Sequence, residues 1–255
     1  MRSLVLVLVA VSACTSHAGP GTGEIAMSNS AEALPASKAR GQATAYFANG
    51  SLDRAICQAA TTLGACIVRT KCQGNDEPVT HYSAGAITIG TAITLTPDVG
   101  GSYGGAGIAD GRYVAPNTPL SLHATGDQIS SFELSLTSPE PLTVLAPART
   151  TTEVARTSDL AIVWSGITTG TVSARITNGL DISSSIDCTF AGADGVGTIS
   201  AAALALFGSA SGSLAITAHA TATTTVDAWD VRFLVIDDAA WADGSTGVLA
   251  LAFHD

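Results

Sequence analysis

The sequence is poor in charge, in lysine and in aromatic side chains. Charged residues make up 13% of its 255 residues, well below the roughly 25% that is usual in globular domains. Acids outnumber bases by 21 to 11, and lysine occurs only at Lys38 and Lys71. Such a chain offers no basic surface for phosphate groups, so we expect no nucleic-acid partner. The scarcity of Glu, Lys and Leu argues against a coiled coil or helical bundle, whereas a hydrophobic content of 46% excludes disorder of the whole chain.

Long apolar runs are also missing, except at the N-terminus. Residues 4–11 are apolar without interruption, follow Arg2 and precede Ser12-Ala13-Cys14. The run is shorter than the roughly 20 residues of a transmembrane helix. A basic start, a short apolar stretch and small residues are typical of a secretory signal, which we predict over residues 1–13.

The end of this stretch, Val11-Ser12-Ala13-Cys14, resembles the lipobox of bacterial lipoproteins. The alternative is an ordinary secretory signal that ends in a chance cysteine. The resemblance implies that Cys14 becomes the first residue and carries acyl chains such as palmitate, so that the lipid binds the membrane. Thr15, rather than an aspartate, follows the cysteine, which by the same resemblance favours the outer membrane. We therefore expect a cell-envelope protein, on the periplasmic or the outward side of that membrane.

The rest of the chain divides by composition into three stretches. Residues 14–41 are rich in Ser, Ala, Gly and Pro and show no sustained period, which predicts a flexible tether. Short strand-like runs follow, and a polar, Thr-rich interval at residues 147–157 separates two groups of them. We predict a first β-rich domain over residues 42–147 and a second β-rich domain over residues 148–255.

Runs of alternating or β-branched residues, each stopped by a turn signal, predict an all-β protein that is a sandwich or a barrel. The hairpin signal is clearest at residues 171–190, where Asn178-Gly179 supplies the two positive-φ positions of a type I′ turn. One short helix is expected over residues 201–207, because Ser200 can cap its first turn and Gly208 can end it. The other expected strands are residues 43–47, 66–72, 86–89, 92–95, 111–114, 120–124, 132–136, 142–145, 160–164, 213–226, 230–236 and 246–253.

If Cys14 is acylated, four cysteines remain, and an even number in an exported chain suggests disulfides. Residues 66–72 form an expected strand whose ends lie roughly 20 Å apart, too far for a disulfide between Cys66 and Cys72. Two pairings stay open: Cys57–Cys72 with Cys66–Cys188, or Cys57–Cys66 with Cys72–Cys188. Neither closely spaced cysteines nor paired histidines occur, so we expect no metal site among them.

Tryptophan and aspartate supply further candidates for a binding site. Trp164 alternates with Ile162 and is expected in the core, whereas Trp229 and Trp241 lie near turns and are the candidate binding aromatics. Aspartates gather near the C-terminus, but without the spacing of a calcium loop, so we expect them to be solvated rather than to bind a metal. They are Asp227, Asp230, Asp237, Asp238 and Asp243.

A serine motif is the one pattern that points toward catalysis. Residues 100–104 match GxSxG around Ser102, but the glycines that follow would break the helix that a nucleophile elbow needs. His81, or His123 with Asp127, could be imagined as partners of Ser102, although no spacing selects them. We expect a surface loop here, and no catalytic residue or cofactor.

Several short segments resemble uncharacterised surface lipoproteins of the myxobacterial type. They are residues 83–89 (SAGAITI), 131–139 (SFELSLTSP), 159–166 (DLAIVWSG), 187–190 (DCTF) and 197–204 (GTISAAAL). The resemblance implies an exported, lipid-anchored protein of antiparallel Ig-like β-sandwich modules, with residues 148–255 as an Ig-like β-sandwich domain, and without assigned catalytic residues. We accordingly expect a non-enzymatic protein with a binding or structural role in the envelope, and an envelope protein or a polysaccharide as its partner. The alternatives are a carbohydrate-binding or adhesion module that uses exposed aromatics and, third, a secreted serine hydrolase.

Overall fold

The computed structural model describes residues 21–29, 41–49, 55–74, 79–91, 93–108, 114–178 and 181–255. Within these ranges the chain forms one long sheet, two small sheets and a single short α-helix. The prediction of an all-β sandwich of largely antiparallel strands with one short helix is therefore confirmed. Parallel pairs occur between β1 and β17, between β10 and β18, and between β11 and β19.

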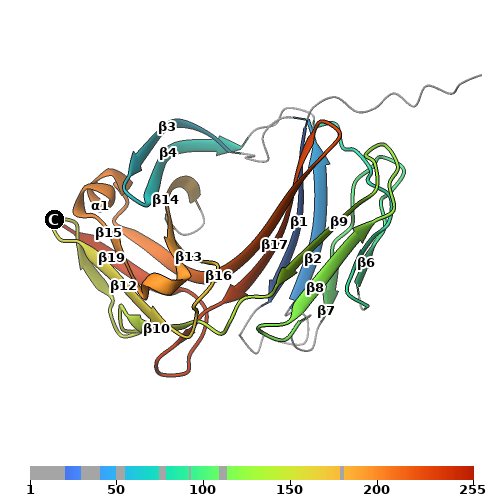
Figure 1. Cartoon of the computed structure of the whole chain (residues 1–255). Coiled ribbons are helices and arrows are strands. Elements are labelled where there is room, and N and C mark those ends of the chain that lie inside the picture. Colours follow the sequence, from blue (N-terminus) through green and yellow to red (C-terminus); the bar gives the residue numbers. More distant parts are fainter. Residues whose placement is uncertain are drawn as a thin grey trace, which may run out of the picture.

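The long sheet contains eleven of the described strands. Its main path runs β3 (Ala55–Leu63), β4 (Cys66–Gly74), β14 (Asp181–Ala191), β13 (Thr171–Asn178), β16 (Ser211–Val226), β17 (Trp229–Asp238), β1 (Gly21–Asn29), β2 (Gly41–Ala48) and β7 (Ala106–Ile108). Strand β19 (Leu249–His254) pairs with β16, and β11 (Glu153–Ala155) pairs with β19. Figure 1 shows that this sheet is strongly curved, with an open concave side.

Two small four-stranded sheets lie against the convex side at opposite ends of the long sheet (Figure 1). The first small sheet has the order β6 (Ile93–Leu95), β5 (Ile87–Ile89), β8 (Pro119–Ala124) and β9 (Phe132–Thr137). The second has the order β15 (Val196–Ile199), β12 (Leu160–Ser165), β10 (Thr143–Ala146) and β18 (Ala240–Trp241). The first small sheet and the long sheet enclose one hydrophobic core, which we name the first core. The second small sheet and the long sheet enclose another, the second core. The molecule is thus a double sandwich that shares one sheet.

The hairpin of β16 and β17 crosses both cores. Leu214 and Ile216, early in β16, are buried in the second core, whereas Trp229 and Phe233 of β17 are buried in the first. Alternate residues of both strands point to the opposite, concave side, because successive side chains of a strand face opposite ways. From Thr217 onward, the outward positions of β16 carry threonine, except for His219. One hairpin therefore supplies hydrophobic residues to both sandwiches and polar residues to the concave face.

The local predictions of helix and hairpin are confirmed. Helix α1 (Ala201–Phe207) begins after Ser200, whose side chain accepts a hydrogen bond from the backbone N–H of Ala203, and ends at Gly208 with φ 70°. Its buried residues join the second core. Strands β13 and β14 pair as an antiparallel hairpin. Gly179 of the predicted turn lies outside the described residues.

The predicted tether over residues 14–41 is wrong for residues 21–29, which form β1 in the interior of the long sheet. Ile25 and Met27 are fully buried in the first core, and Gly23 leaves room for an aromatic ring: a Cβ at this glycine would lie 2.4 Å from the ring of Phe47. The alternation of inward apolar and outward polar residues in β1 is not evident from the sequence, because the first inward position is a glycine. Pairing with β17 on one side and β2 on the other orders the segment.

The predicted boundary after residue 147 does not separate the two sandwiches. Strand β4 pairs with β14, and β17 pairs with β1, so each half of the long sheet combines both predicted domains. The polar interval at residues 147–157 also contains β11. Non-local strand pairing overrides the composition shift on which the predicted boundary rests.

The first of the two disulfide pairings left open by the sequence is confirmed. Cys57 bonds to Cys72, with an S–S distance of 2.05 Å, and Cys66 bonds to Cys188, with 2.02 Å. Both bridges join residues that face each other on neighbouring strands, β3 with β4 and β4 with β14. The predicted strand over residues 66–72 is β4, which explains why its two cysteines bond to different partners.

Candidate functional site

The concave side of the long sheet contains a polar cavity of about 1030 Å³. We name it the concave groove and define it by its lining residues. It lies on the solvent side of the sheet, opposite the two cores. Its lining residues are Thr22, Gly23 and Glu24 of β1, Arg69 of β4, Arg175 of β13, Thr223, Thr224 and Thr225 of β16, and Asp230, Val231 and Arg232 of β17.

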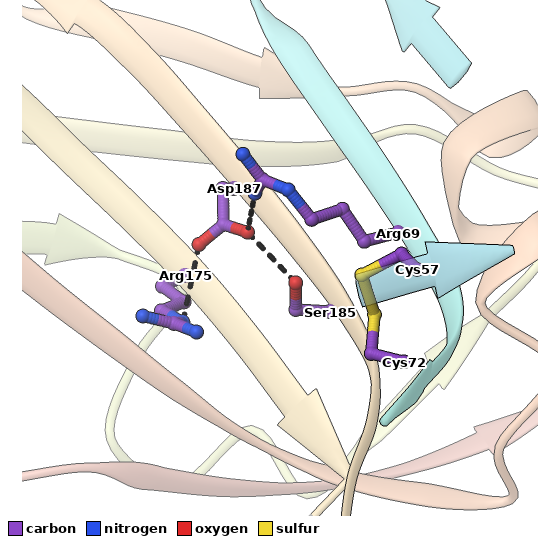
Figure 2. A network of polar contacts seen from close by, with 6 residues as sticks. All are labelled: Cys57, Arg69, Cys72, Arg175, Ser185 and Asp187. Atoms are coloured by element: carbon purple, nitrogen blue, oxygen red, sulfur yellow. Dashed lines mark hydrogen bonds and ion pairs between the residues drawn. A yellow bond between two sulfur atoms is a disulfide. The ribbon is translucent and has the colours of Figure 1, made fainter. Parts of the chain in front are cut away.

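One wall of the concave groove is organised by Asp187 (Figure 2). Its Oδ2 accepts a hydrogen bond from Nη1 of Arg69 at 2.6 Å and another from the hydroxyl of Ser185 at 2.7 Å. Its Oδ1 lies 3.1 Å from Nε of Arg175. These residues come from three adjacent strands, β4, β14 and β13, and one carboxylate therefore orients two guanidinium groups.

The opposite wall is built by β1, β16 and β17. Arg232 forms an ion pair with Glu24, which faces it across the parallel β1–β17 pair. The hydroxyl of Thr225 donates a hydrogen bond to Oδ1 of Asp230 at 3.2 Å, and Thr223 is an exposed neighbour on the same face of β16. This wall thus presents hydroxyl groups next to one arginine and two carboxylates.

The charges of this protein are unevenly placed. Among the described residues, the basic side chains inside the groove are Arg69, Arg175 and Arg232. The others are Lys71, which is exposed, and Arg149 and Arg156, which donate to backbone carbonyls in other parts of the chain. In a chain with a formal net charge of −10, the concave groove is therefore where guanidinium groups gather.

A smaller cavity of about 330 Å³ adjoins the groove through Glu24. This side pocket is also lined by Thr44, Ala45, Tyr46, His81, Ser102 and Tyr103. The rings of Tyr46 and His81 meet edge to face at a centroid distance of 5.1 Å. The hydroxyl of Tyr103 donates to the carbonyl of Gly85 and accepts from the N–H of Ala84, both at 2.8 Å. Burial raises the pKa of Tyr103, so it remains a neutral structural anchor.

His219 lies on the same face of β16 as the threonines of the groove. Its Nε2 is 2.8 Å from the hydroxyl of Thr217. Burial, with a smaller contribution from the positive charge of Arg232, lowers the pKa of His219. A neutral histidine is therefore favoured here, and the groove gains no cation from it at neutral pH.

Both predicted binding aromatics are buried, so that prediction is wrong. Trp229 is 1% exposed and packs against Tyr82 and Phe47 in the first core. Trp241 is 2% exposed, donates its Nε1–H to the carbonyl of Gly247 at 3.1 Å and lies beneath the guanidinium of Arg149. Their positions near turns suggest exposure, but Trp229 of β17 packs into the first core and Trp241 of β18 packs into the second core.

The structure brings Ser102 and His81 together in the side pocket, but not in the arrangement of a nucleophile elbow. Ser102 lies in a loop fastened by Asp98, whose carboxylate accepts its N–H at 2.9 Å, and the next element is β7 rather than a helix. No hydrogen bond joins Ser102 to His81 within the described ranges. His123, on β8, and Asp127 do not line this pocket.

In the described part of the chain, no group of three His, Cys, Asp or Glu side chains is arranged to hold a metal ion. No helix in those ranges is long and apolar enough to span a membrane. The predicted lipidation residue, Cys14, lies outside the described residues.

The residues that form the concave groove were not predicted from the sequence. Arg175 and Asp187 each occupy an outward position of a strand in the hairpin that the sequence does predict. The available signal is weak: charged residues are rare in this chain, and these two face each other across the expected type I′ hairpin. Arg69 meets Asp187 through the β4–β14 pair, and Glu24 meets Arg232 through the β1–β17 pair, and the strands of both pairs are distant in sequence.

No protein-family model matches the chain, and no curated protein matches it. The function is therefore inferred from the geometry of the concave groove and from the sequence.

Proposed function

We propose that this chain is a lipid-anchored protein of the bacterial cell envelope that binds a polysaccharide in the concave groove. The observation that carries the proposal is the groove itself, a cavity of about 1030 Å³ lined by threonine hydroxyls, guanidinium groups and carboxylates. Hydroxyl groups donate and accept hydrogen bonds, as do those of sugars, and arginine supplies several fixed donors. A hydroxyl-rich polymer matches this lining.

The position of the groove favours a polysaccharide over an extended peptide. Strands β13, β16, β17 and β1 lie in the interior of the long sheet, and their backbone groups are paired with neighbouring strands. A peptide strand therefore cannot extend the sheet at this place. Val231 is the apolar side chain of the lining, and it is buried. The groove thus lacks the apolar anchors on which protein interfaces depend.

The side pocket extends this surface toward aromatic side chains. Tyr46 and His81 lie in direct ring contact, and Glu24 lines both cavities. Aromatic rings with a polar edge combine apolar contact with hydrogen bonding. A sugar chain that follows the groove past Glu24 would reach them. Aromatic contact with a sugar would thus come from Tyr46 and His81 rather than from tryptophan.

Anchoring through Cys14 would hold the groove close to the membrane. Gly21, the first residue of β1, follows Cys14 by seven residues, and a chain of this length spans at most about 25 Å. Thr22 already lines the groove. The lipid-anchored protein would therefore keep its ligand within a short distance of the envelope surface.

The binding proposal is tested by removing hydroxyls without changing side-chain shape. The double variant Thr223→Val/Thr225→Val should weaken polysaccharide binding by about tenfold or more, since each lost hydrogen bond is worth roughly 1 kcal/mol. The matched control is Thr94→Val/Thr198→Val, at exposed strand positions of the two small sheets. Affinity electrophoresis against a panel of neutral and acidic polysaccharides measures both. No retardation by any polymer, or an equal loss in the control, would overturn the proposal.

The anchoring proposal is tested by cell fractionation. The full chain should require detergent for release from the membrane fraction, and Cys14→Ala should move it to the soluble fraction. Ser16→Ala is the matched control, two residues away. A chain that is released without detergent, or whose fractionation is the same in Cys14→Ala, would contradict lipid anchoring.

A further inference from the structure

We propose that the ligand of the concave groove is an acidic polysaccharide, and that the guanidinium of Arg175 binds one of its carboxylate or sulfate groups. This inference rests on the proposed function and adds the chemical class of the ligand. The nitrogen donors of Arg175 are used unequally. Nε of this residue lies 3.1 Å from Asp187, whereas its two terminal nitrogens have no partner in the described part of the chain. Figure 2 shows the single contact between Asp187 and Arg175.

Asp187 holds the guanidinium of Arg175 in place but does not use all of its nitrogen donors. Both carboxylate oxygens are engaged, one by Arg175 and the other by Arg69 and Ser185. One carboxylate is therefore shared between two guanidinium groups. Asp187 contacts Arg175 through Nε alone and leaves its terminal nitrogens for a ligand.

The shape of the available donors specifies an oxyanion. The terminal nitrogens of a guanidinium form a planar fork that binds a carboxylate, sulfate or phosphate through two parallel hydrogen bonds. The Arg175 side chain is 57% exposed, and it lines the groove together with Arg69. Because Asp187 holds the Nε edge, the fork is oriented before a ligand arrives, which reduces the entropy lost on binding.

The opposite wall sets a limit on the charge of the ligand. Arg232 is paired with Glu24, and Asp230 adds a second carboxylate. That wall therefore carries an excess of one negative charge and repels a second anion. A polymer whose acidic groups alternate with neutral hydroxyl-rich stretches satisfies both walls. A nucleic acid, with a phosphate at every step, does not.

The inference is tested with polymers that differ only in their acidic groups. Polygalacturonate is compared with its methyl ester, which keeps the backbone and masks the carboxylates, and dextran sulfate is compared with dextran. We expect the full-length protein to bind at least one acidic polymer about tenfold more tightly than its neutral counterpart. Preference for the carboxylate or for the sulfate pair identifies the group that Arg175 binds. Binding should weaken as salt is added, because it involves exposed charges.

Variants then assign the preference to Arg175. Arg175→Gln should abolish the difference between acidic and neutral polymer, and Arg175→Lys, which keeps the charge but not the fork, should restore only part of it. Lys71→Gln removes an exposed charge from the same sheet outside the groove and should change nothing. Circular dichroism confirms the fold of each variant. If Arg175→Gln does not fold, galacturonate should compete with the polymer for wild-type protein, and methyl galacturonate should not.

The possible results separate the two proposals. Equal binding of acidic and neutral polymers that is still lost in Thr223→Val/Thr225→Val overturns the role of Arg175 and leaves polysaccharide binding intact. Failure of all polymers overturns both proposals. Binding of polyglutamate as tightly as of the acidic polysaccharides, with the same dependence on Arg175, overturns the assignment to a polysaccharide.

Discussion

The two halves of this molecule are held together by different means. The half around the second core contains both disulfides, and Cys66–Cys188 connects residues 122 positions apart. The half around the first core contains no described cysteine and is filled by an aromatic group of Phe47, Tyr103, Phe132 and Trp229. Each half contributes one wall of the concave groove.

The difference follows from what lies behind each wall. Strand β1 covers the first core, so burial of Ile25 and Met27 stabilises its wall directly. At the other end, residues 58–62 of β3 are exposed, and this edge of the sheet has little core behind it. The Cys57–Cys72 bridge fastens this edge strand to β4. One wall of the groove is thus fixed by packing, and the other by packing together with cross-links.

The largest effect is expected from the long-range disulfide. The double variant Cys66→Ala/Cys188→Ala should lower the free energy of unfolding by about 4.7 kcal/mol, because the bridge closes a loop of more than 100 residues in the unfolded chain. Cys57→Ala/Cys72→Ala, which opens a loop of 15 residues, should lose about 3 kcal/mol. Urea unfolding under non-reducing conditions measures both. A larger loss of unfolding free energy for the short loop than for the long one would contradict this dependence on loop length.

The first half should depend instead on its aromatic packing. Phe47→Ala should lower the free energy of unfolding by about 3 to 5 kcal/mol, because it leaves a cavity between the two sheets. Hydrogen exchange should show lost protection in β1, β2 and β8, and less change in β13 and β14. Leu145→Ala, at an exposed position of β10, is the control and should have little effect. Uniform loss of protection across both cores would show that the halves do not unfold separately.

A smaller effect is expected at the helix of the second half. Ser200→Ala removes the side chain that caps α1 and should cost about 1 kcal/mol. Ser135→Ala, at an exposed position of β9 in the first half, should be neutral by comparison. Thermal unfolding monitored by circular dichroism distinguishes the two. Equal stability of both variants would mean that the cap contributes nothing beyond the packing of Leu204 and Phe207.

The smallest effect is a pH dependence that originates at His219. Its pKa is lowered in the folded protein, so the unfolded chain binds a proton first as the pH falls below about 6.5. The contribution of His219 to the free energy of unfolding is therefore complete above about pH 6.5. It declines as the pH falls further, until the pKa of His219 in the folded protein is reached. The difference in unfolding free energy between wild type and His219→Gln, measured at pH 7.5 and at pH 5.5, should shrink on acidification. An unchanged difference would contradict the assignment.

Local signals in the sequence predict part of this structure well. Ser200 and Gly208 mark both ends of α1, and the Asn178-Gly179 pair marks the hairpin of β13 and β14, because capping and turn geometry depend on neighbouring residues. The spacing of Cys66 and Cys72 also suffices to reject one disulfide pairing. These features need no knowledge of distant parts of the chain.

Features that depend on distant pairing could not be predicted in this way. Strand β1 has few large apolar residues, and its place is set by β17, more than 200 residues later. Arg69 meets Asp187 only because β4 pairs with β14. Trp229 follows a turn, as exposed residues often do, yet the length of β16 and β17 brings it under the first small sheet. The candidate site is therefore a product of topology.

The parallel alignment of β1 with β17 also has a mechanical consequence. The two strands run in register from Gly21 opposite Trp229 to Asn29 opposite Asp237, and β2 flanks β1 on its other side. A pull on the N-terminus acts along β1, so the hydrogen bonds on both sides bear the load together in shear and do not open one after another. If the lipid at Cys14 holds one end and a moving polymer occupies the groove, drag on that polymer would be carried across the interior of the sheet.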